Sequence, residues 1–275
     1  MPKTLYISDL DGTLLDWQAE LSSETESELN RFIQSGIHFS IATARTAATC
    51  ERILSGVNFQ IPVVLMNGVL IYDMSSKHYV KKHVLSKGTV TDICDVMHRT
   101  GVCGFMYTLE DDRLATYYEK LSCDAMRAFM DERVKKYNKP FCPVTDFREV
   151  GQDVIYFAFM DSYERIHKLF DQIRNVDGVR VEKYSDVYDK DLWYMEIFAK
   201  AASKYHAVQY LRDRYGFEKV VAFGDNLNDI PLFEASDVRY AVKNAKDELK
   251  AMADAVIESN EENGVVKQIQ RIEAL

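Results

Sequence analysis

Hydrophobic positions follow two different periods at the start of the chain. Leu5–Ile7, Ile37–Ala42 and Pro62–Met66 are short apolar runs with the length of buried strands. Apolar residues at three- and four-residue spacing predict a helix over Ser22–Gln34, with Ser23 as its N-cap, and another helix between the second and third runs. Strands that alternate with helices are typical of a parallel sheet covered by helices on both faces.

The pattern changes between about residues 81 and 191. Arg113–Glu119 and Asp153–Met160 are predicted strands, and the acidic turn at residues 110–112 indicates a β-hairpin. Three segments with helical spacing lie among them: Thr89–Arg99, Asp124–Lys136 and Tyr163–Arg174. This block predicts an inserted α+β domain.

The first pattern returns after a strand predicted over Tyr194–Phe198. A helix is predicted over Ser203–Arg214, and strands over Lys219–Phe223 and Val238–Val242. Because this resumes the alternation of the first 66 residues, we expect the chain to return to the first domain here.

The length of the chain agrees with two domains. Its 275 residues, 47% hydrophobic and 28% charged, are typical of soluble globular proteins with roughly 100–200 residues per domain. We predict an α/β fold in which residues 1–82 and 191–275 form a Rossmann-like parallel sheet core with helices on both faces. Residues 83–190 are the predicted α+β insertion.

Acidic residues outnumber basic ones by 43 to 34, which gives a formal net charge of −9. This excess does not favour binding to nucleic acid or to anionic lipid, although a local lysine or metal ion can still hold a small phosphorylated ligand. No segment has the pattern of a signal peptide or a membrane span, and the five cysteines form no C-x-x-C pair. We expect a soluble, cytoplasmic protein without nucleic-acid or membrane partners.

Two carboxylates one residue apart, Asp9 and Asp11, follow the first predicted strand. Open α/β sheets bind ligands at the carboxyl ends of their strands. A carboxylate beside a metal ion can attack phosphorus to form an aspartyl phosphate, and a second one can move protons for the leaving group and then for water. Gly12 lets the chain turn directly afterwards. The alternative is an acidic turn without chemistry.

Three further segments offer groups that suit phosphate chemistry. Gly224–Asp229 follows a predicted strand and can complete an oxygen-ligand shell for Mg²⁺, or it is a turn that caps the next helix. Thr43 and the following amides can hold phosphate oxygens, or Thr43 is an N-cap. Lys204 offers a positive charge to a phosphoryl group. Because Lys204 stands at the start of a predicted helix, we expect its side chain to be peripheral to the core.

Together these motifs resemble those of the haloacid dehalogenase-like phosphatases. The resemblance rests on their order and spacing in the chain: Asp9-x-Asp11-Gly12-Thr13, Thr43, Lys204 and Gly224-Asp225-x-x-Asn228-Asp229. The insertion looks like the larger cap domain of the Cof-like subfamily. Asn67-Gly68 and Glu262–Val265 are also similar to segments of Cof-like proteins, so the resemblance covers nearly the whole chain.

The resemblance implies a role for each matching residue. Asp9 is the expected nucleophile and a magnesium ligand, and Asp11 is the expected general acid/base, whose main-chain carbonyl also binds the metal. Asp225 is the remaining protein ligand, and Asp229 holds the water shell of the metal. The expected phosphate contacts are the Leu10 amide, Thr43, the Ala44 amide, Lys204 and Asn228.

Two positions depart from the family pattern. Ala44 and Tyr205 stand where the family usually has glycine, yet both keep a backbone N–H, so we expect phosphate binding to persist with altered room for the rest of the substrate. Arg45 either reaches the leaving group or is a surface arginine at a helix start.

The resemblance implies a Mg²⁺-dependent phosphatase for a small phosphorylated metabolite such as a sugar phosphate, with the cap contributing to specificity. Two other functions stay open: a phosphomutase that uses the same aspartyl phosphate, and a binding protein without catalysis. Release of free phosphate without an isomeric product separates a phosphatase from a mutase.

Overall fold

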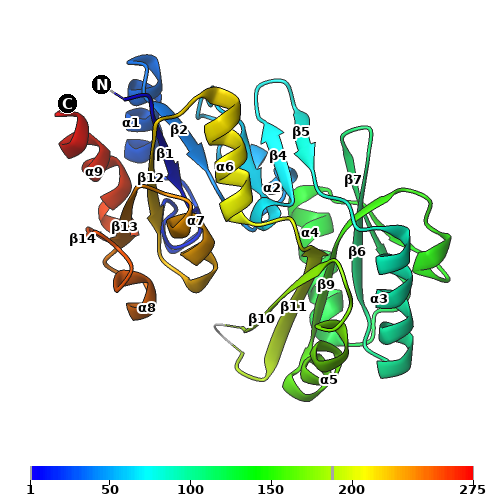
Figure 1. Ribbon diagram of the computed structural model, residues 1–275. Helices are drawn as coiled ribbons and strands as arrows, with labels where there is room; N and C mark the ends of the chain where they lie inside the picture. Colours follow the sequence, from blue (N-terminus) through cyan, green and yellow to red (C-terminus); the bar gives the residue numbers. More distant parts are fainter. Residues whose placement is uncertain (1, 187–188, 275) are drawn as a thin grey trace. The chain divides into compact units, whose positions relative to one another are not determined.

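The computed structural model describes residues 2–186 and 189–274. Residues 1, 187, 188 and 275, which the predicted domain ranges include, lie outside the described part. The chain divides into two compact units (Figure 1). The first unit combines the residues up to Lys81 with those from Ser203 onward, and the second unit is Lys82–Ala202.

The first unit is built on a parallel five-stranded sheet in the order β14-β13-β12-β1-β2. Its strands are β1 (Thr4–Ser8), β2 (His38–Ile41), β12 (Lys219–Gly224), β13 (Val238–Val242) and β14 (Ala255–Ile257). The neighbours β1 and β12 lie far apart in the sequence, and Tyr6 is opposite Val221 in their register (Figure 1). The predicted parallel core is therefore present, and its first strand pairs directly with a late one.

A small antiparallel sheet continues from the edge at β2. It consists of β3 (Val63–Leu65), β4 (Leu70–Asp73) and β5 (His78–Lys82), in that order. A parallel bridge between Ala42 and Val64 places β3 next to the end of β2. The 3₁₀ turn η1 (Met66–Gly68) reverses the chain between β3 and β4.

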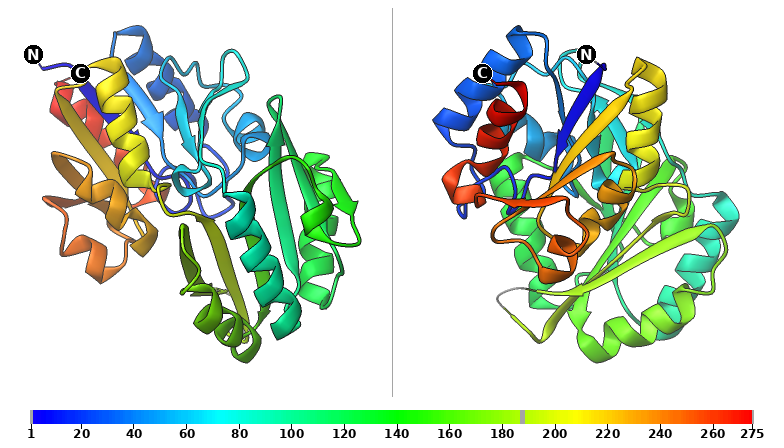
Figure 2. Two further views of the ribbon diagram at one scale, coloured as in Figure 1. Left: turned by 45° about the vertical axis from the view of Figure 1, so that its right-hand side comes forward. Right: turned by 60° about the vertical axis from the view of Figure 1, so that its left-hand side comes forward.

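Helices cover both faces of the parallel sheet. They are α1 (Ser23–Gln34), α2 (Ala47–Ile53), α6 (Lys204–Tyr215), α7 (Ile230–Glu234), α8 (Asp247–Lys250) and α9 (Gly264–Glu273). Helices α1 and α9 lie together on one face, and α6 and α7 lie on the other (Figure 2). The N-cap of α1 is Ser22 and not the predicted Ser23: Ser22 has extended backbone, and its Oγ accepts the Thr25 N–H at 3.1 Å. Two adjacent serines offer the same capping group, so the pattern does not distinguish them.

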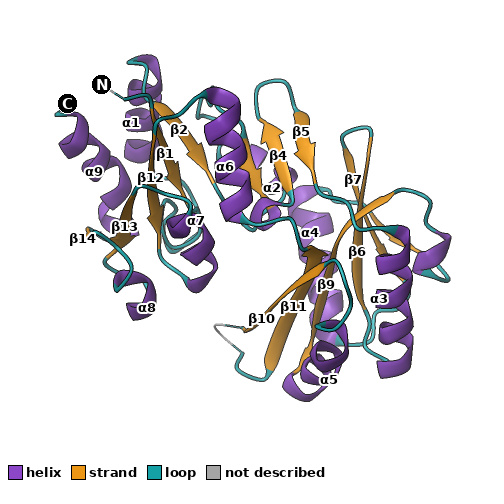
Figure 3. Ribbon diagram, viewed as in Figure 1, coloured by secondary structure: helices purple, strands orange, loops and turns teal. Residues whose placement is uncertain are grey.

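The second unit contains a six-stranded sheet in the order β10-β11-β9-β6-β7-β8 (Figure 3). Its elements are α3 (Lys87–Thr100), β6 (Gly104–Glu110), β7 (Arg113–Tyr118), α4 (Asp124–Tyr137), β8 (Phe141–Pro143), the 3₁₀ turn η2 (Phe147–Glu149), β9 (Asp153–Ser162), α5 (Tyr163–Ile173), β10 (Val179–Ser185) and β11 (Leu192–Ala199). Apolar residues of α3 and α5 form one buried core with Phe157 of β9 and Met195 of β11.

Strand β11 accounts for the difference between the predicted boundary at residue 191 and the structural one after Ala202. It pairs antiparallel with β9 and β10, so that Met195 lies opposite Phe159 and Lys183. The expectation that the chain returns to the first domain at this strand is therefore wrong. Alternating apolar residues indicate a strand, but they do not indicate which sheet it joins. In the part of the chain that the structure describes, no helix combines the length and apolar character needed to cross a bilayer.

Candidate active site

Three carboxylates meet at the carboxyl ends of the two central strands of the first unit. Asp9 directly follows β1, and its N–H donates to the Phe223 carbonyl of β12 at 3.0 Å. Asp225 directly follows β12, and Asp229 ends the 3₁₀ turn η3 (Leu227–Asp229). One oxygen from each of these carboxylates lies within 4.8 Å of the others. Parallel pairing of β1 with β12 brings two distant segments to this point.

Lys204, the first residue of α6, reaches into this group. Its Nζ lies 2.6 Å from Asp9 Oδ1 and 2.7 Å from Asp229 Oδ1. The Lys204 side chain is only 1% exposed. The expectation that this residue is peripheral is therefore wrong. Helix α6 begins where its N-cap Ser203 accepts the His206 N–H, and this start directs the lysine inward.

Burial and crowded negative charge set the protonation of the site. Burial, and then the charge of Asp229, raise the pKa of Asp9 well above its ordinary value, although Lys204 lowers it. The same two causes raise the pKa of Asp225 to about 7, against the lowering effect of a hydrogen bond from Thr13. Burial lowers the pKa of Lys204, but the charges of Asp229 and Asp9 outweigh it, so the net pKa is raised. The ammonium group therefore stays charged.

The donor set fits a hard divalent cation. Asp9, Asp225 and Asp229 offer carboxylate oxygens, which Mg²⁺ prefers in proteins. Among the described residues, the charge partner of this group is Lys204, so one positive charge meets three carboxylates. A bound dication would offset the remaining negative charge. Asp229 is already engaged: its Oδ1 contacts Lys204, and its Oδ2 accepts the N–H groups of Asp225 and Asn226 at 3.0 and 3.1 Å.

Gly12 allows the two acidic loops to approach each other. Its φ is +79°, and a Cβ at this position would lie 2.6 Å from Asp225 Oδ2. Glycine is therefore needed for the left-handed turn and also for the space beside Asp225. The Asn244 side chain holds the turn by donating to the Gly12 carbonyl at 2.7 Å.

Asp11 is not a member of the carboxylate group. Its carboxylate accepts two hydrogen bonds from the guanidinium of Arg45, at 2.8 Å from Nε and 2.5 Å from Nη2. The Asp11 side chain is 49% exposed, whereas that of Arg45 is 19% exposed. Neither prediction for Arg45 from the sequence included this ion pair. Asp11 and Arg45 follow different strands, so their spacing in the chain does not indicate that they meet.

Three more of the predicted phosphate contacts, Leu10, Thr43 and Ala44, lie just after β1 and β2. Thr43 is buried after β2, its N–H donates to the Val64 carbonyl at 2.9 Å, and its Oγ1 accepts the Arg45 N–H at 3.1 Å. Ala44 beside it is exposed, and Leu10 beside Asp9 is fully buried.

The last two positions of interest lie on the α6 and η3 sides of the site. Asn228 is half-buried within η3. Tyr205, at one of the positions that depart from the family pattern, is 37% exposed, and its ring packs edge-on against His206 with 5.3 Å between ring centroids. This side chain therefore extends toward solvent from the helix start.

Thr13 is a site residue to which the sequence assigned no role. Its hydroxyl donates to Asp225 Oδ1 at 3.0 Å and so orients that carboxylate. Its place directly after Gly12 in the first motif is the signal that could have identified it. The partner, however, follows from the pairing of β1 with β12.

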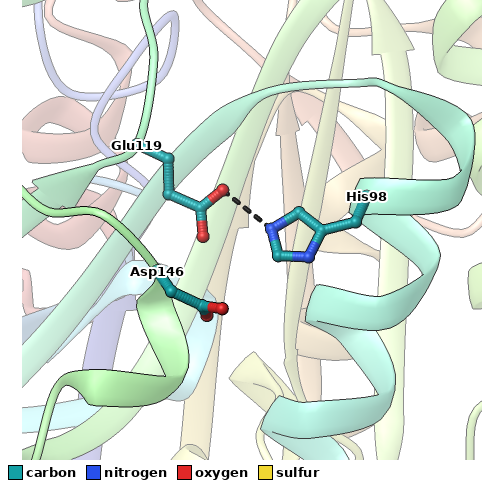
Figure 4. A group of neighbouring side chains, drawn as sticks. All are labelled: His98, Glu119 and Asp146. Atoms are coloured by element: carbon teal, nitrogen blue, oxygen red, sulfur yellow. Dashed lines mark hydrogen bonds and ion pairs between the residues drawn. The ribbon is translucent and has the colours of Figure 1, made fainter.

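The second unit contains another group of ligand-type side chains, His98, Glu119 and Asp146 (Figure 4). His98 Nε2 lies 2.9 Å from one Glu119 oxygen, and the other accepts the Phe147 N–H at 2.8 Å. Arg148 Nε lies 2.9 Å from both Asp146 oxygens. These hydrogen bonds lower the pKa of Asp146 to about 2. Protein groups therefore already neutralise this cluster, which ties two loops to α3.

Comparison with known proteins assigns the family. A family model described as haloacid dehalogenase-like hydrolase matches residues 6–269. The chain belongs to the haloacid dehalogenase-like hydrolases. The resemblance predicted from the motifs is confirmed, and so is the predicted α/β fold with an inserted cap domain.

Relatives of this hydrolase cover almost its full length. YwtE of Bacillus subtilis, a 5-amino-6-(5-phospho-D-ribitylamino)uracil phosphatase, is 28% identical over 96% of this chain and 96% of its own. YbhA of Escherichia coli, a pyridoxal phosphate phosphatase, is 26% identical over 95% of each chain. The structure of TM0651 from Thermotoga maritima has a TM-score of 0.79 at 23% identity and covers 98% of this chain and 97% of that one. The structural likeness supports the fold, and YwtE and YbhA are both named as phosphatases.

Proposed function

We propose that this hydrolase is a Mg²⁺-dependent phosphatase that transfers the phosphoryl group of a small phosphorylated metabolite to Asp9 and then to water. The observation that best supports this proposal is the buried contact of Lys204 with Asp9 and Asp229, next to Asp225. This arrangement combines a carboxylate nucleophile, a positive charge and hard oxygen ligands at one end of the sheet. These are the groups that phosphoryl transfer to a carboxylate requires.

In the first step, a carboxylate oxygen of Asp9 attacks phosphorus, and the bond from phosphorus to the ester oxygen breaks. Lys204 holds the Asp9 carboxylate at 2.6 Å, so the nucleophile is oriented before the substrate arrives. The ammonium group also offsets charge on the phosphoryl oxygens. When bound, Mg²⁺ supplies further charge neutralisation. We assign its ligands as Asp9, Asp225 and the main-chain carbonyl of Asp11.

Asp229 supports these groups without contacting the substrate. Its two oxygens bind Lys204 and the backbone N–H groups that open the Asp225 loop. It thereby orients the lysine and the loop together. We assign it, as expected from the family resemblance, to the water shell of the metal rather than to direct metal binding.

Asp11 is the proposed proton carrier. It gives a proton to the departing ester oxygen and later accepts one from the water that attacks the aspartyl phosphate, which releases inorganic phosphate and restores Asp9. Its pair with Arg45 has to open for this, since both Asp11 oxygens accept hydrogen bonds from the guanidinium. Phosphate oxygens are strong acceptors for arginine, so an incoming substrate can take over Arg45 and release Asp11.

The remaining phosphate contacts are the Leu10 amide, Thr43, the Ala44 amide and Asn228. The inserted unit, proposed here as the cap, contributes to substrate specificity. Relatives named for ribitylaminouracil and pyridoxal phosphates support a small metabolite as substrate, and we favour a sugar phosphate within this class. The net charge of −9 supports an enzyme without a nucleic-acid or membrane partner. The odd, scattered set of five cysteines without a C-x-x-C pair supports a reducing, cytoplasmic compartment.

A hydrolysis panel tests this function. Sugar phosphates, nucleotides and cofactor phosphates are incubated with the protein and Mg²⁺, and released phosphate is measured, with Asp9→Asn as the matched blank. We expect Mg²⁺-dependent release by the wild type and a loss of at least roughly 10³-fold in the folded Asp9→Asn variant. Turnover by that variant at the wild-type rate contradicts the assignment. An isomeric product without free phosphate indicates a mutase, and binding without turnover indicates the non-catalytic alternative.

A further inference from the structure

The turn between β3 and β4 has an unusual backbone. Met66, Asn67 and Gly68 have φ angles of 49°, 54° and 94°, so three consecutive residues are in the left-handed region. Glycine and asparagine tolerate this region, but methionine rarely enters it. Met66 is 2% exposed and Asn67 is 4% exposed. The surrounding structure therefore has to hold the turn in a conformation that costs free energy.

The amide groups of this turn hold the loop that follows β2. The Met66 N–H donates to the Arg45 carbonyl at 3.1 Å, and the Asn67 N–H donates to the Thr43 carbonyl at 3.0 Å. Arg45 is the partner of Asp11, and Thr43 is a proposed phosphate contact. Two consecutive left-handed residues thus direct their N–H groups to two residues of the loop that follows β2.

Gly68 contacts the beginning of α6. A Cβ at Gly68 would lie 2.2 Å from the Ser203 carbonyl oxygen and 2.9 Å from the Lys204 nitrogen. Both are backbone atoms, which cannot move aside as a flexible side chain can. Only glycine therefore allows the first turn of α6 to lie this close. Lys204 extends from this contact to Asp9.

We propose that the turn Met66–Gly68 is a positioning element that sets Thr43, Arg45 and Lys204 relative to Asp9. The inference rests on the proposed phosphatase function and identifies residues that act on the site without touching the reacting atoms. The segment after β2 and the start of α6 are far apart in the sequence, and the turn contacts both. In its left-handed conformation, the turn directs the N–H groups of Met66 and Asn67 to the loop after β2. It also places the Cα of Gly68, which has no side chain, against the start of α6.

The first test is Gly68→Ala with Gly216→Ala as the matched control. Gly216 caps the other end of α6 and has φ of 67°, but a Cβ there meets nothing within 4 Å. Both variants place alanine in the left-handed region, and only Gly68→Ala pushes against the backbone at Lys204. The full-length proteins are compared in Mg²⁺-dependent hydrolysis of p-nitrophenyl phosphate and in inhibition by inorganic phosphate.

A small displacement of an aligned group can lower the rate of a reaction by about 10²-fold. For Gly68→Ala we expect kcat to fall by about this factor and the inhibition constant of inorganic phosphate to rise at least roughly fivefold. For Gly216→Ala we expect both to stay within about twofold of wild type, because its Cβ meets no neighbouring atom. Wild-type kinetics in Gly68→Ala, or equal losses in both variants, overturn the proposal.

A second pair covers the case in which Gly68→Ala does not fold. Asn67→Gly and Asn67→Ala both remove the side-chain carboxamide, but only glycine enters the left-handed region without strain. We expect Asn67→Gly to retain at least roughly fivefold more activity and tighter phosphate inhibition than Asn67→Ala. Equal kinetics of the pair show that the backbone conformation is not what matters, and the proposal fails.

Binding of inorganic phosphate separates this inference from the function on which it rests. The increase in melting temperature on adding inorganic phosphate with Mg²⁺ is measured for the wild type and for the Gly68 and Gly216 variants. If the wild type hydrolyses no phosphoester but its phosphate-dependent increase is lost only in Gly68→Ala, the phosphatase proposal fails and the positioning role stands. If the wild type is active and Gly68→Ala matches it in both assays, the positioning role alone is wrong.

Discussion

Two groups of ligand-type side chains in this protein have similar spacing but different electrostatics. In the group Asp9, Asp225 and Asp229, as in the group His98, Glu119 and Asp146, the ligand atoms all lie within 4.8 Å of one another. In the first group, burial and mutual repulsion raise the pKa of two of its acids, Asp9 and Asp225. In the second, the hydrogen bonds from Arg148 lower the pKa of Asp146 to about 2.

The comparison teaches that spacing is a weak sign of a metal site and that residual charge is a stronger one. The first group lies where parallel strands end, and Lys204 is shared between two of its carboxylates. The second group joins His98 of α3 to two loops of a mostly antiparallel sheet, where Arg148 and the backbone satisfy the acids. A buried excess of negative charge calls for a cation, whereas a set of satisfied ion pairs does not.

We expect the largest difference between the two groups when each loses its central positive charge, that of Lys204 or that of Arg148. The difference concerns turnover and the free energy of unfolding. Lys204→Met leaves buried carboxylates without their partner, so we expect turnover to fall by about 10²–10³-fold and the unfolding free energy without metal to fall by about 3 kcal/mol. Arg148→Met breaks an exposed pair, so we expect only a small loss of stability and unchanged turnover. Hydrolysis of p-nitrophenyl phosphate and urea unfolding measure both quantities. Equal effects of the two substitutions contradict the distinction.

Metal removal gives the next largest contrast. Magnesium at about 100 times its dissociation constant adds about 2.7 kcal/mol, so we expect the melting temperature to be roughly 5 °C higher with Mg²⁺ than with EDTA. Asp225→Asn removes a proposed ligand and is expected to abolish this increase, whereas His98→Ala keeps it. Differential scanning fluorimetry checks all three proteins. If Asp225→Asn keeps the Mg²⁺-dependent increase in melting temperature, or His98→Ala loses it, the metal does not bind at the Asp225 group.

The smallest expected effect is an acid dependence of stability that comes from Asp146. Its pKa is lowered to about 2 by the Arg148 hydrogen bonds, from 3.8 ordinarily. Its contribution is therefore fully present above pH 4 and is lost as the pH falls toward 2. Since the pair is exposed, we expect less than about 1 kcal/mol. Urea unfolding at pH 5 and pH 3 should show a smaller decrease in the free energy of unfolding for Asp146→Asn than for wild type. If this decrease is the same in both proteins, the pair of Asp146 with Arg148 does not contribute to stability.

The motifs predicted the carboxylates and their meeting point because each follows a β-prone run. In a parallel sheet, chain direction then places them at one edge. Thus Asp9 and Asp225 could be expected together before the order of the strands was known. The family could be predicted from the same residues. The burial of Lys204 could not, because a helix start has both a solvent side and a core side.

Local pattern and chain direction were enough to indicate the elements, the α/β core and the two acidic strand ends of this hydrolase. Partners across space were not predictable in this way: the Arg45 hydrogen bonds to Asp11, the pairing of β11 with β9, and the contact of Gly68 with Ser203. Each of these depends on where two separate segments pack. The alternation or spacing within one segment is compatible with several such packings, and the folded chain adopts the one in which all segments satisfy their contacts together.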